Sequence, residues 1–219
     1  MNKAEVCDWI EKNKIIAICR KIYGDDLARL TEALAEGGVK MIEVTFDQAD
    51  PRHLEKTAEA IELISRVSGS AVLPGAGTVM SLEQLETARQ AGALYIISPN
   101  TNEKVIRATV EKSMVSIPGA MTPSEIAAAH EYGADFVKLF PTSYLGLDYI
   151  KAVRAPISHV KLVATGGIKE DNLADYLNVG MVGAGVSGRL TDAKLIREGD
   201  FAEITRRAAA FAAIAGGEG

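Results

Sequence analysis

The chain has 219 residues, 47% of them hydrophobic, and a formal net charge of −5 at pH 7. This charge gives no basis for binding nucleic acid, and no apolar run reaches the roughly 18 to 20 residues that cross a membrane. The first residues lack the apolar segment of a secretory signal. The two cysteines, Cys7 and Cys19, are too few for a disulfide framework, so we expect a reduced, cytoplasmic protein.

The predicted elements alternate along the chain. Residues 2–13 form a leading helix, and eight short apolar, largely β-branched runs follow, each of them typical of a buried strand. These runs are 15–19, 41–45, 71–73, 95–97, 115–117, 136–140, 160–164 and 181–186. The segments between them, such as 25–36, 51–67, 81–91 and 123–132, place apolar residues three and four apart, which is typical of amphipathic helices.

Helix boundary signals support this assignment. Ser81 with Gln84, and Thr122 with Glu125, have the spacing of a capping box at a helix start. Gly92 follows one predicted helix and Gly133 another. No Pro- or Ser-rich linker divides the chain, so we expect residues 1–219 to form a single domain.

Eight strands that alternate with helices predict parallel βαβ units. The simplest closure is a (β/α)8 TIM barrel with a short N-terminal helix. An open doubly wound sheet is the alternative, but no G-x-G-x-x-G turn follows the first strand. Most predicted strands end in small or hydroxylated residues, and in a barrel such ends line one opening. These ends are 75–78, 98–100, 118–122, 141–143, 165–167 and 185–188.

Lys138 lies in the middle of the apolar run 136–140. Because a strand alternates its faces, Lys138 shares a face with Phe136 and Phe140. A buried lysine either pairs with a buried carboxylate, reaches a nearby surface, or serves as a reactive amine. An apolar pocket disfavours the ammonium form, which makes a neutral nucleophile available near pH 7.

Glu43 is equally unexpected in the predicted strand 41–45, where alternation places it on one face with Met41 and Thr45. Glu43 and Lys138 together form either a buried ion pair or a catalytic pair. Desolvation offsets most of the attraction in a buried ion pair, so its net contribution to stability is small. A lysine nucleophile beside a carboxylate base is what imine chemistry on a 2-oxo acid requires, without a metal or other cofactor.

Two turns point to a phosphate site. Thr165, Gly166 and Gly167 follow the seventh strand, and Ser187 follows the eighth. Small residues there let backbone N–H groups approach a phosphate, and barrels often bind phosphate at these two strand ends. Tight packing of consecutive loops is the alternative explanation.

Six motifs together resemble the 2-dehydro-3-deoxy-phosphogluconate (KDPG) aldolase / 4-hydroxy-2-oxoglutarate (KHG) aldolase family. They are Ile-Glu-Val-Thr at 42–45, Gly-Ala-Gly-Thr-Val at 75–79, Ile-Ser-Pro at 97–99, Ile-Pro-Gly at 117–119, Phe-Val-Lys-Leu-Phe-Pro at 136–141 and Thr-Gly-Gly-Ile at 165–168. Each is short, but together they run nearly from end to end of the chain. The resemblance implies a class I aldolase with a (β/α)8 fold and, as in many relatives, a homotrimer.

The resemblance also implies residue roles. Lys138 would form the imine, and Glu43 would be the general acid and base. Thr78 and Pro99 would line the substrate pocket. The substrate phosphate would be held by a further set, namely Thr165, Gly166, Gly167 and Ser187.

One position departs from the family pattern. Where many relatives have an arginine that binds the substrate carboxylate, this chain has Asp47, which would repel a carboxylate. Arg20 ends the first predicted strand with the parity of Ile16 and Ile18, and some relatives carry an arginine there. We therefore predict that Arg20 binds the carboxylate, since a guanidinium suits that task better than an ammonium.

The sequence thus predicts a metal-free lyase that cleaves a 2-oxo-3-deoxy-6-phospho sugar acid, or a 4-hydroxy-2-oxo acid, to pyruvate and an aldehyde. Two alternatives stay open. One is a phosphosugar isomerase or epimerase barrel that uses Glu43 as its base. The other is a non-catalytic barrel that binds a sugar acid or phosphate, with Lys138 and Glu43 as a buried pair.

Overall fold

The computed structural model describes residues 1–217, and its strands form one parallel sheet in the order β5-β4-β3-β2-β1-β9-β8-β7-β6. The strands are β1 (Ile15–Cys19), β2 (Met41–Thr45), β3 (Leu73–Gly77), β4 (Tyr95–Ile97), β5 (Val115–Ile117), β6 (Gly119–Ala120), β7 (Val137–Leu139), β8 (Leu162–Thr165) and β9 (Gly183–Val186). Neighbours in this order pair in parallel, as the alternating sequence pattern predicts.

The fifth barrel strand is split in two at Pro118, because proline has no N–H to donate to the ladder. Its first part, β5, pairs with β4, and its second part, β6, pairs with β7. The Phe136 N–H donates to the Ser116 carbonyl (3.2 Å), and the Lys138 N–H donates to the Pro118 carbonyl (2.8 Å). These bonds close the sheet, which confirms the predicted (β/α)8 barrel.

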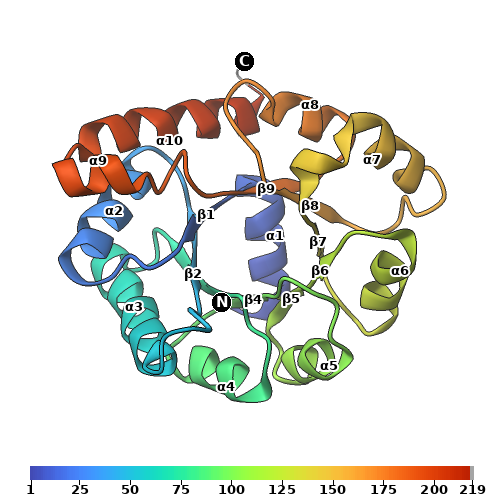
Figure 1. Cartoon of the computed structure of the whole chain (residues 1–219), viewed down its shortest axis with the longest axis horizontal. Helices are drawn as coiled ribbons and strands as arrows, with labels where there is room; N and C mark the ends of the chain where they lie inside the picture. The colour runs from blue at the N-terminus through green and yellow to red at the C-terminus, as the bar shows by residue number, and fades with distance from the viewer. Residues whose placement is uncertain (218–219) are drawn as a thin grey trace.

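Helices surround this barrel on its outside (Figure 1). They are α2 (Gly24–Glu36), α3 (His53–Ser68), α4 (Leu82–Gln90), α5 (Glu103–Glu111), α6 (Pro123–Glu131), α7 (Gly146–Arg154), α8 (Leu173–Asn178), α9 (Ala193–Glu198) and α10 (Phe201–Gly216), with a 3₁₀ turn, η1 (Thr142–Tyr144). In residues 1–217, none of the helices combines the length and the apolar character that a membrane span requires.

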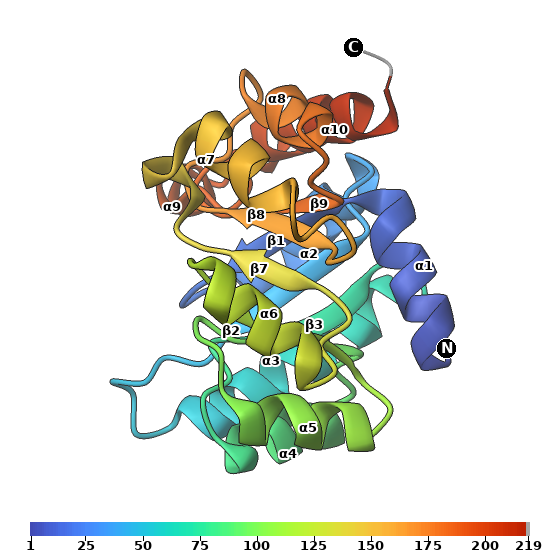
Figure 2. The ribbon, with the colours of Figure 1, turned by 90° about the vertical axis from the view of Figure 1, so that its right-hand side faces the viewer.

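Helix α1 (Lys3–Asn13) closes the barrel at the N-terminal ends of the strands (Figures 1 and 2). Val6 and Ile10 are its buried residues, and both belong to the apolar cluster inside the barrel. The Trp9 indole N–H donates to the carbonyl of Lys40, just before β2 (3.3 Å). The leading helix is therefore part of the barrel core.

The strands bury both faces, as strands in an all-parallel sheet do. The inner faces and α1 form one apolar cluster, and the outer faces pack against the helices in a larger one. The inner cluster consists of Val6, Ile10, Ile16, Met41, Leu73, Tyr95, Ile97, Val115, Ile117, Phe136 and Val163.

The third strand lies further along the chain than predicted. The sequence pattern predicted 71–73 as the strand and 75–77 as part of the loop, whereas β3 is Leu73–Gly77. A side chain at Gly75 would meet the Tyr95 ring, and one at Gly77 would meet the Glu43 carboxylate. These glycines are strand residues that make room for larger side chains inside the barrel. A search for runs of apolar residues does not detect such a strand.

The two capping predictions have different outcomes. Thr122 and Glu125 form a complete capping box at the start of α6. At the start of α4 only half of the box is present. The Ser81 hydroxyl accepts from the Gln84 N–H, but the Gln84 side chain accepts from the Met80 N–H instead of closing the box (2.7 Å).

Candidate active site

Lys138 and Glu43 both lie inside the barrel. Lys138 is the central residue of β7, with 8% of its surface exposed, and Glu43 is the central residue of β2, with 1% exposed. The flanking residues Val137 and Leu139 belong to the outer cluster, while Phe136 belongs to the inner one. The two polar side chains therefore project into the interior, as strand alternation predicts.

Within residues 1–217 neither Lys138 nor Glu43 forms a side-chain ion pair of 4.0 Å or less. The Lys138 ammonium instead lies 5.0 Å from the centroid of the Phe140 ring. Burial raises the pKa of Glu43, and the nearby positive charges of Lys138 and Arg20 partly oppose that rise. The structure thus lacks the direct buried ion pair that was the alternative explanation of these two residues.

The Glu43 carboxylate occupies space that two neighbouring strands leave free. In the β2–β3 register Glu43 is opposite Gly75, and Thr45 is opposite Gly77. A Cβ atom at Gly77 would lie only 1.6 Å from Glu43 Oε1. Any larger residue at position 77 would displace the carboxylate, so this glycine fixes where Glu43 can lie.

A hollow of about 370 Å³ opens at the C-terminal ends of β1 to β4. It brings together three residues that the sequence analysis singled out, namely Arg20, Thr78 and Pro99. Thr45 also lines it; this residue follows Glu43 by two positions and lies on the same inward face of β2. This hollow is the mouth of the barrel on the side of β1 to β4, and the buried Glu43 and Lys138 are not among the residues that line it.

Asp47, the departure from the family pattern, lies in this mouth beside Lys21. The Lys21 ammonium is 3.0 Å from Asp47 Oδ2, and its hydrogen bond lowers the pKa of the Asp47 carboxyl. Arg20 is exposed and has no ion-pair partner in the described part of the chain. Asp47 is thus an ionised, paired carboxylate, whereas the Arg20 guanidinium is available to an anion.

Thr78 adopts a positive φ of 57°, a strained conformation for a β-branched residue. The Gln48 side chain donates to the Thr78 carbonyl (3.0 Å), and the buried Gln84 side chain donates to Gln48 (2.9 Å). Gln48 and Gln84 therefore brace the loop that presents Thr78 to the mouth. The sequence analysis missed both roles; the spacing of Gln84 from Ser81 was the only signal, and it indicated a cap.

The two predicted phosphate turns lie side by side, because β8 and β9 are neighbours and Thr165 is opposite Gly185. Gly166 and Gly167 have φ values of +102° and +76°, which favour glycine. In residues 1–217 their backbone N–H groups donate to no acceptor, and Ser187 is exposed just beyond β9. The structure thus brings all four predicted residues to one corner of the mouth.

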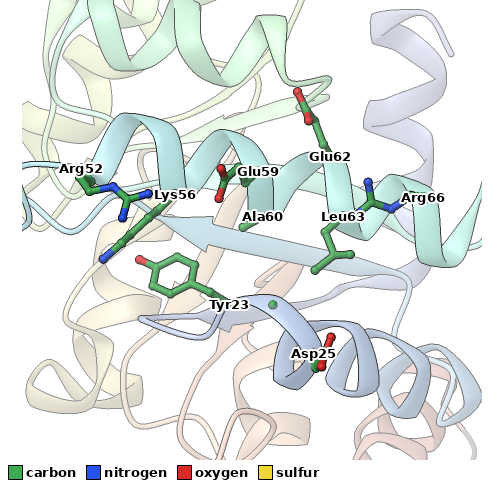
Figure 3. Close-up of a pocket in the computed structure, with 10 residues that line it drawn as sticks. Tyr23, Asp25, Arg52, Lys56, Glu59, Ala60, Glu62, Leu63 and Arg66 are labelled. Atoms are coloured by element: carbon green, nitrogen blue, oxygen red, sulfur yellow. The ribbon is translucent and has the colours of Figure 1, made fainter.

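A separate hollow of about 460 Å³ lies on the outside of the barrel, between α2 and α3 (Figure 3). Tyr23 and three cations line it: Arg52 pairs with Glu55 and Lys56 with Asp50, whereas Arg66 forms no ion pair within residues 1–217. Because none of the predicted site residues lines this hollow and it lies outside the barrel, it does not belong to the active site.

A buried lysine and a buried glutamate inside one parallel barrel, below a mouth that carries a free arginine, place the chain in the class of aldolase barrels. The chain belongs to the KDPG and KHG aldolase family, whose family model matches residues 6–207.

Relatives with aldolase names agree with this assignment. The chain is 36% identical to the 2-dehydro-3-deoxy-6-phosphogalactonate aldolase of Escherichia coli K12, over 93% of this chain and 95% of the relative. It is 35% identical to the 2-dehydro-3-deoxy-phosphogluconate aldolase of Treponema pallidum, over 91% and 92% of the two chains.

Solved structures show the same fold. A native KDPGal structure superimposes with a TM-score of 0.81 at 32% identity, covering 91% of this chain and 93% of its own. The KDPG aldolase of Legionella pneumophila, with pyruvate captured as a covalent carbinolamine intermediate, superimposes with a TM-score of 0.83 at 26% identity, over 96% and 98% of the two chains.

Proposed function

We propose that this aldolase cleaves a 2-oxo-3-deoxy-6-phospho sugar acid, or a 4-hydroxy-2-oxo acid, to pyruvate and an aldehyde through a Schiff base on Lys138. The observation that carries the proposal is the position of Lys138, buried inside the barrel, in the same interior as Glu43 and without an ion pair in the described residues. The covalent pyruvate intermediate in the Legionella relative supports the same chemistry.

Lys138 supplies the nucleophile. Its neutral amine adds to the C2 carbonyl of the substrate to give a carbinolamine, and loss of water gives the protonated imine. When the C3–C4 bond breaks, its electron pair moves into the imine to form an enamine, and the C4 hydroxyl becomes the carbonyl of the departing aldehyde. Protonation of the enamine at C3 and addition of water at C2 then release pyruvate and restore the amine.

Glu43 moves the protons in this cycle. Its carboxylate accepts the proton of the C4 hydroxyl as the bond breaks, and the resulting acid returns a proton to C3 of the enamine. A general base works best when its pKa is close to the working pH. Burial raises the pKa of Glu43 and so moves it in that direction.

The remaining residues hold the two ends of the substrate. Arg20 binds the carboxylate next to the 2-oxo group, with Thr78 and Pro99 lining the same side of the mouth. The substrate phosphate, where the aldehyde carries one, binds at Thr165, Gly166, Gly167 and Ser187. The free N–H groups and left-handed backbone of the two glycines support this part of the proposal.

Three further expectations remain proposals. We propose a cytoplasmic homotrimer in which residues 1–219 form one domain. One similar solved structure is a cube-shaped cage designed by fusing symmetric oligomeric domains. It superimposes with a TM-score of 0.82 at 32% identity, covering 93% of the present chain and 72% of the cage chain. This likeness supports an oligomer, and light scattering on the purified protein tests whether three copies associate.

Reductive trapping tests the function. Incubation with pyruvate and borohydride should add one reduced pyruvyl group, and peptide mapping should place it on Lys138. A panel of phosphorylated and unphosphorylated 2-oxo acids, with pyruvate release as the readout, then identifies the substrate. An isomerase, epimerase or binding barrel would gain no pyruvate mass. An adduct on Lys40 or Lys161 would refute the assignment of Lys138.

A further inference from the structure

Tyr95 carries a buried hydroxyl that the proposed mechanism does not use. It is the first residue of β4, it is fully buried, and it belongs to the cluster inside the barrel. Among residues 1–217 its hydroxyl has no hydrogen-bond partner. Buried polar groups in folded proteins are nearly always paired, so an unpaired phenol inside an enzyme barrel calls for a functional explanation.

The sheet register places Tyr95 in one row with Glu43. Glu43 on β2 is opposite Gly75 on β3, and Gly75 is opposite Tyr95 on β4. A Cβ atom at Gly75 would lie 2.1 Å from Cε2 and 2.3 Å from Cζ of Tyr95. The ring therefore lies over the backbone of β3, the strand between β4 and the strand that carries Glu43.

The Glu43 carboxylate lies over the same strand, one inward position higher. Its Oε1 atom occupies the space of a Cβ at Gly77. Successive inward positions of a strand are only about 6.6 Å apart. The ring of Tyr95 and the carboxylate of Glu43 thus lie over neighbouring inward positions of β3, a spacing that one bridging water would span.

The hydroxyl is also in the right protonation state to donate. Burial and the negative charge of Glu43 raise the pKa of Tyr95 well above its ordinary value. The positive charges that act on Glu43 are those of Lys138 on β7 and Arg20 just beyond β1, and the Cys19 thiol at the end of β1 lies near enough for Glu43 to raise the pKa of that thiol. Lys138 is the proposed nucleophile and Arg20 the proposed carboxylate ligand, and the buried Cys19 thiol faces the outer cluster.

We propose that Tyr95 is a positioning residue that donates a hydrogen bond to the Glu43 carboxylate, directly or through one water, and aims it at the carbon that exchanges its proton. This inference rests on the proposed role of Glu43. Gly75 and Gly77 make the arrangement possible, because side chains at these positions would occupy the space of the phenol and the carboxylate.

The hydrogen bond has a measurable consequence. A donor to the carboxylate favours its charged form and lowers the pKa of Glu43, opposing the effect of burial. Without the phenol hydroxyl, Glu43 should titrate at a higher pH. The pH at which its base function is half lost should therefore rise by about one unit or more.

The test is Tyr95→Phe, which keeps the ring and removes only the hydroxyl. The readout is the exchange of pyruvate methyl protons with solvent as a function of pH, divided by the amount of adduct that borohydride traps on Lys138. We expect the acid limb of this pH profile to move to higher pH and the plateau rate to fall. The amount of trapped adduct and the melting temperature should not change. Tyr176→Phe, on the outer side of the barrel, should leave the profile as it is in the unmodified protein.

Three outcomes would overturn the inference, and they can be told apart. If Glu43→Gln slows exchange but Tyr95→Phe has the normal profile, Tyr95 does not position the base. If Glu43→Gln exchanges at the normal rate, the proposed role of Glu43 fails and the inference fails with it. If the two substitutions lower the exchange rate additively in the double variant, the phenol acts independently of the carboxylate.

Discussion

The two ends of the barrel interior are built from the same strands but differ in chemistry. On β2, Met41 lies at the N-terminal end and Glu43 two residues further on, while β7 is preceded by Phe136 and carries Lys138. At the lower end, Met41 and Phe136 belong to an apolar cluster together with residues of α1. Further up, the inward positions of β2, β3 and β7 hold Glu43, the glycines and Lys138, whereas β4 and β5 end in the apolar Ile97 and Ile117.

The difference shows how a barrel separates stability from catalysis. The lower end excludes water with large apolar side chains and a helix, which contributes to the free energy of unfolding. The upper end gives up apolar contacts at Gly75 and Gly77 and buries two ionisable groups, both of which are unfavourable for stability. One strand thus serves both tasks because its inward residues follow one another along the barrel axis.

The largest effect is expected at Lys138, in the upper end. Lys138→Ala should abolish both the borohydride-trapped pyruvate adduct and substrate turnover, because no other lysine is buried among residues 1–217. Lys138→Arg should be equally inactive, since a guanidinium stays protonated and cannot attack a carbonyl. A trapped adduct in either variant would show that the nucleophile lies elsewhere.

Glu43→Gln is expected to have the next largest effect. Removal of a general acid and base typically lowers kcat by on the order of 10²–10⁴-fold. The isosteric amide should leave the fold intact and should still permit adduct formation on Lys138. Circular dichroism and reductive trapping provide these controls. A kcat within a few-fold of the unsubstituted protein would remove Glu43 from the mechanism.

Arg20→Ala should affect binding more than chemistry. Because Arg20 is exposed, its loss should cost about 1.5–3 kcal/mol, as for a hydrogen bond to a charged group, or roughly 10- to 150-fold in kcat/KM. Arg20→Lys should recover part of this loss, because it keeps the charge but not the two-pronged geometry. Lys21→Ala is the matched control, since Lys21 lies in the same mouth but is paired with Asp47. Equal losses in both variants would refute a specific role for Arg20.

Ile10→Ala tests the lower end of the barrel and should have the smallest effect on catalysis. Ile10 is 1% exposed in the cluster that closes the barrel. Truncation of a buried isoleucine to alanine costs about 2–5 kcal/mol of stability. We expect a lower denaturation midpoint with kcat unchanged at a temperature where the variant is folded. A large fall in kcat in that folded variant would contradict the separation of the two ends.

The sequence by itself determined the alternating strands and helices, the parallel barrel and the inward direction of Glu43 and Lys138. These features depend on local patterns, because side chains in a strand alternate with a period of two and helix starts carry their own capping residues. A glutamate and a lysine inside apolar runs are exceptional residues, so they are visible without any knowledge of their neighbours.

Only the tertiary structure decided how the strands share space inside the barrel. It showed that Gly75 and Gly77 belong to β3, that Pro118 divides the fifth barrel strand, and that the Lys21 ammonium pairs with Asp47. It also brought Tyr95 into one row with Glu43. These relations depend on register between strands far apart in the chain, and no single run of residues encodes which side chain will lie over a distant glycine.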